Sequence, residues 1–239
     1  MYPKRCRFCD RHSDECLGQS ARRNGAVPRA KPEVQPQRCW NWFKPQHQQR
    51  DRGEPALLVA LTKSIVSDYD ADPSRVYVAG LSAGGAMADV LGHCYPDVFA
   101  AVGVHSGVPA GAATDVVSAL AAMRSGPAGH QSSGPRPVAP TIVFHGDADK
   151  TVHERNGAAI VAAAHSKSTT GDTTSVAGQH ATRTVYAESG KKSTAEYWQL
   201  HGVGHAWSGG SAQGSYTHPG GVDASAEMLR FFMQHRTEP

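Results

Sequence analysis

The sequence lacks the features that direct a protein to a membrane, to nucleic acid or to a metal ion. No apolar stretch is long enough to span a bilayer, and no apolar run follows the basic start Met1–Arg7, so no signal peptide is visible. The formal net charge of the 239 residues is only +3, which is too small and too scattered to indicate binding of nucleic acid. No second cysteine pair with ligand spacing accompanies Cys6, Cys9 and Cys16, so we expect no metal site.

Residues 1–37 contain almost no large apolar side chains and are rich in Arg, Gln and Pro. A segment of this composition cannot offset its own ordering entropy, so we expect a disordered arm that carries these three cysteines as unpaired thiols. Order is expected over residues 38–239, whose length suits one α/β domain.

Apolar strands alternate with helical patterns along this domain. The predicted helices span residues 54–69, 83–93, 156–164 and 224–235. The predicted strands span residues 75–79, 99–105, 141–145, 184–187 and 195–200. The first helix has an apolar stripe that we expect to be buried: Leu57, Leu58, Leu61, Ile65, Val66 and Tyr69. Residues 124–140 and 165–182 are expected to be loops, and the alternation predicts a mostly parallel sheet with helices on both faces.

The turn Gly80-Leu-Ser-Ala-Gly84 carries the strongest functional signal. It follows an apolar strand and precedes small, helix-compatible residues, which is the context of a nucleophile elbow. We expect no room for a side chain at Gly80 or Gly84, and a strained Ser82 with its hydroxyl exposed at the carboxyl end of the strand. The following helix directs its dipole and free amides at the position where negative charge develops. Ser82 is therefore the predicted nucleophile.

A serine nucleophile needs a base to take its proton and a carboxylate to hold that base. In folds that carry a nucleophile elbow, the catalytic residues follow the chain order serine, acid, histidine, and each lies on a loop after a strand. Asp147 and Asp149 both follow the strand at 141–145. We favour Asp149, since a loop of that length turns its carboxylate toward the serine. Asp147, nearer the strand end, is placed to bind backbone amides, and either residue can form a turn instead.

Two of the thirteen histidines compete for the role of base. We favour His205 over His201 because Gly202 and Gly204 give the loop freedom to place its imidazole. His105 and His145 end strands, where an imidazole packs or satisfies backbone groups.

Five segments occur in one order along the chain: Arg38-Cys-Trp-Asn-Trp-Phe, Val78-Ala-Gly-Leu-Ser-Ala-Gly-Gly-Ala-Met, Ala101-Val-Gly-Val-His-Ser-Gly, Val143-Phe-His-Gly-Asp-Ala-Asp and Gly204-His-Ala-Trp-Ser-Gly-Gly. Together they resemble the poly(3-hydroxybutyrate) depolymerase family of serine esterases, which also holds feruloyl and acetylxylan esterases. The resemblance runs from about Arg38 to near the C-terminus. It implies an α/β-hydrolase fold, ester hydrolysis through an acyl-enzyme, no cofactor and an extracellular location.

The resemblance also implies roles for particular residues. Ser82 matches the family nucleophile, Asp149 the acid and His205 the base, while the backbone amide of Ala83 matches one oxyanion donor. Three tryptophans flank matching segments and are candidates to line a groove for an acyl or polymer chain: Trp40, Trp42 and Trp207. Aromatic packing beside the core is their alternative role.

The family carries several strands and a His-Gly-Cys loop ahead of the Arg38 segment, and residues 1–37 contain nothing like them. We therefore expect the N-terminal strands to be missing or replaced, which leaves the strand at 75–79 as an apolar edge prone to aggregation. The missing loop supplies a second oxyanion donor, whose loss alone lowers the rate by about 10²–10³.

Three functional interpretations stay open. The first is a serine esterase that acts on acyl esters, including poly(3-hydroxybutyrate), its oligomers, or feruloyl and acetylxylan esters. The second is an inactive or weakly active remnant that retains the groove as a binding module. The third is a peptidase or acyltransferase on the same fold.

Overall fold

The computed structural model describes residues 25–28, 39–128, 138–165, 170–176, 180–187, 190 and 192–238. The arm expected at residues 1–37 lies outside this set, except for residues 25–28, and so do Cys6, Cys9 and Cys16.

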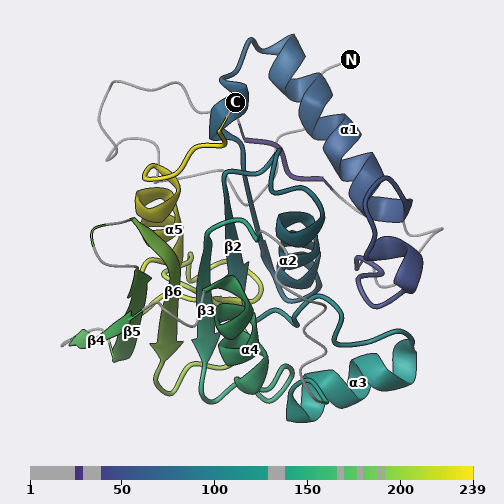
Figure 1. The fold of residues 1–239 in the computed structure, drawn as a ribbon. Coiled ribbons are helices and arrows are strands. Elements are labelled where there is room, and N and C mark those ends of the chain that lie inside the picture. The colour runs from purple at the N-terminus through teal and green to yellow at the C-terminus, as the bar shows by residue number, and fades with distance from the viewer. Residues whose placement is uncertain are drawn as a thin grey trace.

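The protein is built around a six-stranded sheet with the strand order β1-β2-β3-β6-β5-β4 (Figure 1). Four neighbouring strands run parallel: β1 (Tyr77–Leu81), β2 (Ala101–His105), β3 (Thr141–Gly146) and β6 (Ser193–Leu200). Two antiparallel strands extend the sheet beyond β6: β5 (Ala181–Ala187) and β4 (Thr170–Val176). A short parallel pair, β7 (Trp207–Ser208) and β8 (Thr217–His218), follows in the chain. The mostly parallel sheet expected from the sequence is confirmed.

Helices cover both faces of this sheet. The helices α2 (Ala83–Cys94) and α4 (Arg155–Ala164) pack on one face, and α5 (Ala224–Phe232) packs on the other (Figure 1). Side chains of β3 alternate between the two layers, since Val143 shares a core cluster with Ile160 and Ile142 shares one with Met228. Because both faces are covered, β2 and β3 are buried at every position.

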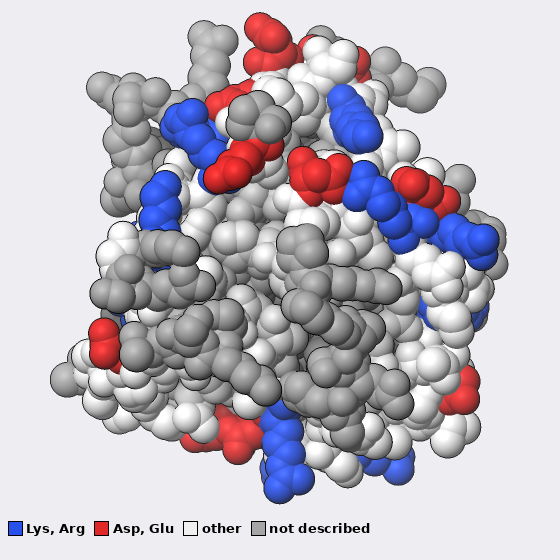
Figure 2. All heavy atoms as spheres, viewed as in Figure 1, with Lys and Arg blue, Asp and Glu red and all other residues white. Residues whose placement is uncertain are grey.

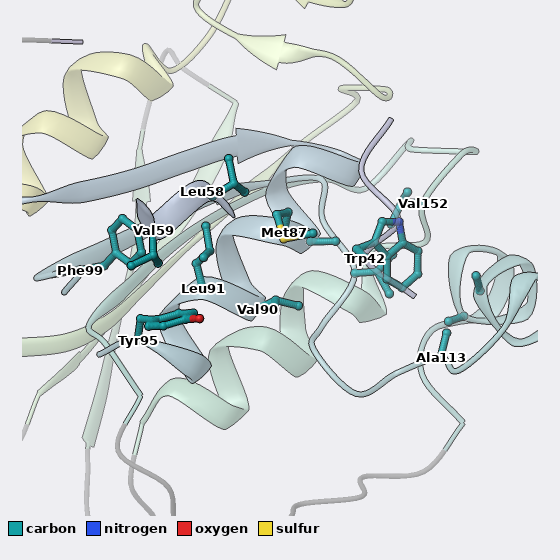
Figure 3. Close-up of a cluster of buried hydrophobic side chains, with 14 residues drawn as sticks. Trp42, Leu58, Val59, Met87, Val90, Leu91, Tyr95, Phe99, Ala113 and Val152 are labelled. Carbon is teal, nitrogen blue, oxygen red and sulfur yellow. The ribbon is translucent and has the colours of Figure 1, made fainter. Parts of the chain in front are cut away.

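In the chain, the helix α1 (Gly53–Asp68) lies between two short 3₁₀ turns, η1 (Pro45–His47) and η2 (Pro73–Arg75). It packs outside α2 (Figure 1). Leu58 and Val59 share a core cluster with Leu91 of α2 and with Tyr95 at its end (Figure 3). This contact buries only a narrow strip of α1, which includes Leu58 and Val59.

The apolar stripe predicted for α1 is therefore wrong in part. Leu57, Leu61 and Tyr69 are 67%, 43% and 64% exposed, whereas Leu58 is buried as expected. Val59, which the stripe did not include, is buried as well. At the N-terminus of α1, the buried Glu54 carboxylate accepts hydrogen bonds from the backbone and side-chain nitrogens of Asn41.

Two of the longer elements, α3 (Val116–Ser125) and β4, were not predicted, and neither were the short strands β7 and β8 or the two 3₁₀ turns. The helix α3 begins with a capping box formed by Asp115 and Ser118. The strand β4 lies in a segment that we expected to be a loop, and residues 171–175 are exposed. A strand with both faces in solvent needs no apolar alternation, so the sequence pattern could not reveal it.

Among the described residues, β1 has β2 as its only strand neighbour, which confirms its expected place at the edge of the sheet. Ala79, in the middle of β1, is exposed, whereas every residue of β2 is buried. An edge of this kind presents backbone groups to solvent and to other chains.

The charged side chains of the described surface are mixed in sign. On the face shown in Figure 2, Lys and Arg alternate with Asp and Glu, and neither sign gathers into a patch. Pairs such as Arg50 with Asp97 and Arg230 with Glu227, each with 2.6 Å between nitrogen and oxygen, neutralise charge locally. Over the described residues, no helix combines the length and the apolar character that crossing a membrane requires.

Candidate active site

Ser82 occupies a sharp turn between β1 and α2. Its backbone has φ +57° and ψ −121°, a left-handed value of φ that a residue with a side chain rarely adopts. The Ser82 amide donates a hydrogen bond to the His105 carbonyl oxygen (2.9 Å), and the Ser82 carbonyl oxygen accepts one from Ala86 (2.9 Å). The strain predicted for this serine is therefore present, and both neighbouring elements hold the turn in place.

One of the two glycine positions predicted to be confined around Ser82 is confined, and the other is not. A Cβ on Gly80 would lie 2.3 Å from the Gly84 carbonyl carbon, so only glycine fits there, as expected. A Cβ on Gly84 would meet nothing within 4 Å, so the expectation for that position is wrong. The second confined position is Gly85, where a Cβ would lie 2.9 Å from the Gly80 carbonyl oxygen. The turn folds the backbone of Gly80 against that of Gly84 and Gly85, while position 84 itself faces open space.

Asp149 lies on the loop after β3 and is held by four groups. Its Oδ1 accepts hydrogen bonds from the amides of Thr151 (2.8 Å) and Val152 (2.9 Å), and its Oδ2 lies 2.7 Å from Nδ1 of His205. Nε2 of His145 lies 3.7 Å from the same Oδ2 and donates to the Val152 carbonyl oxygen (2.8 Å). Burial raises the pKa of the Asp149 carboxyl, but the hydrogen bonds from His205, Val152 and Thr151 outweigh burial and hold the pKa below its ordinary value. Asp149 is therefore an ionised acceptor at neutral pH.

His205 lies on the loop after β6 and is paired with this carboxylate. Because Nδ1 is engaged by Asp149, Nε2 is the nitrogen left to take a proton from a nucleophile. Over the described residues, no hydrogen bond joins His205 to the Ser82 hydroxyl. Such bonds are often long in ligand-free sites and shorten when substrate is bound.

Asp147 and His201, the alternatives to Asp149 and His205, pair with each other. Oδ2 of Asp147 lies 2.9 Å from Nδ1 of His201, and Oδ1 accepts a hydrogen bond from the Gly202 amide (2.7 Å). Nε2 of His201 lies 2.8 Å from the Thr182 hydroxyl. The side chains of Asp147 and His201 are 33% and 43% exposed, compared with 0% and 12% for Asp149 and His205. The structure thus gives one buried aspartate–histidine pair and one exposed pair.

A cavity of about 450 Å³ opens beside Ser82 and Ala83, a size typical of small-molecule sites. Its lining is mostly apolar and comes from the segment before α1, from α3 and from two loops: Cys39, Trp40, Trp42, Phe43, Val108, Val116, Ala119, Leu120, Met123 and Val152. Val152, whose amide binds Asp149, lines the cavity close to Trp42 (Figure 3). The cavity therefore brings the loop of the acid and the turn of the serine to one place.

Ala83 is the first residue of α2, where backbone amides have no partner inside the helix. Its position on the cavity wall next to Ser82 suits the predicted donor to a developing oxyanion. Among the described residues, there is no cluster of three or more His, Cys, Asp or Glu side chains that could hold a metal ion.

The three predicted tryptophans occupy different surroundings. Trp40 and Trp42 line the cavity, and the bonds between Asn41 and Glu54 fix the segment that carries them. Trp207 is not among the lining residues. Its ring stacks on His105 with 5.3 Å between centroids, and its Nε1 donates to the Ser225 hydroxyl (3.1 Å).

The side chains of α3 form one wall of the cavity, a contribution that was not predicted from the sequence. The signal for this helix was present in Asp115-Val-Val-Ser118, where an aspartate and a serine three residues later cap the helix. Two hydrogen bonds to backbone carbonyl oxygens of α3 fix the helix beside the acid loop. The His153 amide donates to Met123 (2.7 Å), and the Asn156 side chain donates to Ala122 (2.9 Å).

The sheet is mostly parallel and lies between two layers of helices. A strained serine follows β1, and an aspartate–histidine pair lies on the loops after β3 and β6. Together these features define the α/β-hydrolase class. The chain belongs to the Esterase PHB depolymerase family, whose family model matches residues 25–185, about two thirds of the chain. This match includes Ser82 and Asp149, begins ahead of Arg38 and ends before His205.

Several known proteins are similar to this chain. Poly(3-hydroxyalkanoate) depolymerase C of Paucimonas lemoignei is 35% identical over 134 residues, which cover 50% of this chain and 31% of that protein. Poly(3-hydroxybutyrate) depolymerase of Ralstonia pickettii is 31% identical over 204 residues, which cover 78% of this chain and 41% of that protein. The chain thus spans less than half the length of either relative. The structure of an acetyl xylan esterase from Aspergillus awamori matches the fold with a TM-score of 0.62 and 20% identity, covering 82% of this chain and 73% of that one.

Proposed function

We propose that this protein hydrolyses carboxylic esters through an acyl-enzyme formed on Ser82, with His205 as the general base and Asp149 as its partner. The observation that carries the proposal is the buried Asp149 carboxylate 2.7 Å from Nδ1 of His205, on a loop that shares its cavity with Ser82. Membership of an esterase family supports the same chemistry.

In the first half of the reaction, Oγ of Ser82 attacks the ester carbonyl carbon while Nε2 of His205 takes the hydroxyl proton. The carbonyl oxygen becomes an oxyanion that the Ala83 amide faces, and Asp149 stabilises the imidazolium through Nδ1. Collapse of the tetrahedral intermediate breaks the ester C–O bond, and the leaving alcohol takes the proton from His205. In the second half, His205 removes a proton from water, whose oxygen attacks the acyl carbon. Collapse of this second intermediate breaks the bond between the acyl carbon and Oγ of Ser82, His205 returns the proton to Oγ, and the carboxylic acid leaves.

The lining of the cavity supports an apolar acyl group as substrate. Trp40, Trp42 and the α3 residues offer hydrocarbon and aromatic surface and no charged side chain. We propose hydroxyalkanoate esters, as oligomers or as a polyester, since two relatives are named as depolymerases of such polymers. The secretion implied by the family resemblance suits a polymer substrate, which cannot cross a membrane.

The proposal is tested by a substrate panel with purified wild type and Ser82→Ala. We expect wild type to hydrolyse p-nitrophenyl butyrate and 3-hydroxybutyrate oligomers, with Ser82→Ala inactive and the matching anilides untouched. A preference for feruloyl or acetylxylan esters over hydroxybutyrate oligomers would keep the chemistry and replace the substrate. A folded wild type without activity on any ester would favour the binding remnant, and cleavage of the anilides would favour a peptidase.

A further inference from the structure

His105 is a buried histidine outside the proposed triad that contacts both halves of the site. It is the last residue of β2 and is 0% exposed. Its carbonyl oxygen accepts the hydrogen bond from the Ser82 amide (2.9 Å). Its ring Nε2 lies 3.1 Å from the Ser208 amide, three residues beyond His205. One residue thus holds the nucleophile turn through its backbone and the segment of the base through its side chain.

These hydrogen bonds define the tautomer of the ring. An amide only donates, so Nε2 accepts and carries no proton, and the proton of the neutral ring sits on Nδ1, 3.2 Å from the Ser106 hydroxyl. Burial is the main cause that lowers the pKa of His105 to about 3; the nearby His145 and His205 act in the same direction, and Asp149 opposes them. The ring is therefore neutral, with a bare Nε2, at the pH at which a histidine base works.

Stacking fixes the plane of this ring. Phe144 of β3 lies 5.9 Å away between ring centroids at an angle of 15°, and Trp207 lies 5.3 Å away at 27°. Trp207 stands between His205 and Ser208 in the chain, so the ring contacts the segment of the base at two successive residues.

The sheet order shows why such a link is needed. Ser82 follows β1 and His205 follows β6, and two strands, β2 and β3, separate them in the sheet. The segment after His205 therefore has to reach back across β3 to approach the serine turn. The end of β2, where His105 sits, is the place at which the hydrogen bonds of the two segments meet.

We propose that His105 is a positioning residue of this site, which sets the separation of Ser82 and His205 by binding the Ser82 amide with its carbonyl oxygen and the Ser208 amide with its ring. The inference rests on the proposed function. His105 touches no reacting atom in this account, and its effect passes through the two residues that do.

A matched pair of variants tests this role. In His105→Gln the side-chain carbonyl oxygen reaches about as far as the original Nε2, so an acceptor for the Ser208 amide remains. In His105→Asn the shorter side chain places its oxygen near the original Nδ1 and leaves that amide without a partner. We expect His105→Asn to lower kcat on p-nitrophenyl butyrate by about 10²-fold with little change in KM, since small misplacements cost rates of this size. His105→Gln should recover most of that loss.

Equal kcat in wild type and His105→Asn would overturn the proposal. An equal loss in both variants, each with native circular dichroism, would overturn it too, because the acceptor at Nε2 would then be irrelevant.

Two further measurements need no esterase activity and separate this inference from the proposed function. Amide hydrogen exchange at Ser208 should be slow in wild type and in His105→Gln and fast in His105→Asn, and equal rates in all three would overturn the link. The ¹⁵N shifts of the His105 ring in wild type should show protonated Nδ1 and bare Nε2, and the opposite tautomer would also overturn it. A wild type without activity on any ester but with these exchange rates and shifts would refute the proposed function and keep the link.

Discussion

Asp147 and Asp149 are two positions apart, and each pairs with a different histidine. Asp149 is buried with His205 beside the cavity, whereas Asp147 joins His201 and the Gly202 amide at an exposed site. The sequence offered both aspartates and both histidines, and spacing alone could only favour one of each. What separates them is the direction of each carboxylate after the Gly146 turn, which depends on tertiary hydrogen bonds that no local pattern encodes.

At the residue scale this difference predicts unequal effects of two isosteric changes. Asp149→Asn should lower kcat on p-nitrophenyl butyrate by on the order of 10⁴, because an amide cannot hold His205 in the required tautomer or stabilise its charge. Asp147→Asn should cost far less, since its partner His201 lies outside the cavity. Steady-state kinetics of both variants check this assignment, and a larger loss in Asp147→Asn would reverse it.

The turn and the helix that follows it form one rigid element, in which two glycines of the Ser82 motif have different roles. Gly80→Ala should lower the free energy of unfolding by about 1–3 kcal/mol or more, because the new Cβ would overlap the Gly84 backbone. Gly84→Ala is the control in open space, and alanine at this helix position should be neutral or stabilise by up to about 1 kcal/mol. Thermal and denaturant unfolding measure both, and a Gly84→Ala protein as unstable as Gly80→Ala would contradict the geometry of the turn.

The helix α3 forms the wall of the cavity that we assign to the acyl chain. Ala119 lines the cavity, whereas Val117 on the same helix is 77% exposed and does not. Ala119→Leu should lower kcat/KM for an octanoyl ester by about tenfold or more and change the acetyl ester little, since a pocket discriminates methylene groups by about this amount. Val117→Leu should leave kcat/KM unchanged for both esters. Equal effects of Ala119→Leu on both esters would place the acyl chain elsewhere.

Elements that belong to the sheet core could be predicted from the sequence, and peripheral ones could not. The strands β2 and β3 are buried on both faces, so their apolar runs were sufficient to predict them. The small residues of α2 were sufficient to predict that helix. The exposed strand β4 carries no apolar alternation, and α1 buries only one narrow strip against another helix. The role of His105 was invisible for a different reason, because it depends on contacts with residues more than one hundred positions away in the sequence.

At the scale of the whole molecule, the edge position of β1 has consequences for association. This strand carries the nucleophile at its end, has one strand neighbour among the described residues and exposes Ala79 at its centre. Sheet edges of this kind pair with other chains unless a charge or a covering segment prevents it. The proposed nucleophile therefore lies at the end of an edge strand of the sheet.

We expect the protein to self-associate through β1 in a concentration-dependent manner. Ala79→Lys should reduce this association, because a charge on an edge strand opposes pairing with another chain. Sedimentation velocity over a range of concentrations compares the variant with wild type, and Val117→Lys on α3 is the matched control for an added surface charge. Monomeric wild type at all concentrations, or an equal effect of both lysines, would contradict the assignment of β1.

The central claim is that Ser82 is a nucleophile activated by His205 and Asp149, and covalent labelling tests it most directly. The purified protein is treated with a fluorophosphonate, which reacts with activated serines, and the labelled peptide is located by mass spectrometry. The account predicts one adduct on Ser82, no adduct in Ser82→Ala, and labelling slowed by several orders of magnitude in His205→Ala. Labelling at another residue, or undiminished labelling in Ser82→Ala, would contradict it.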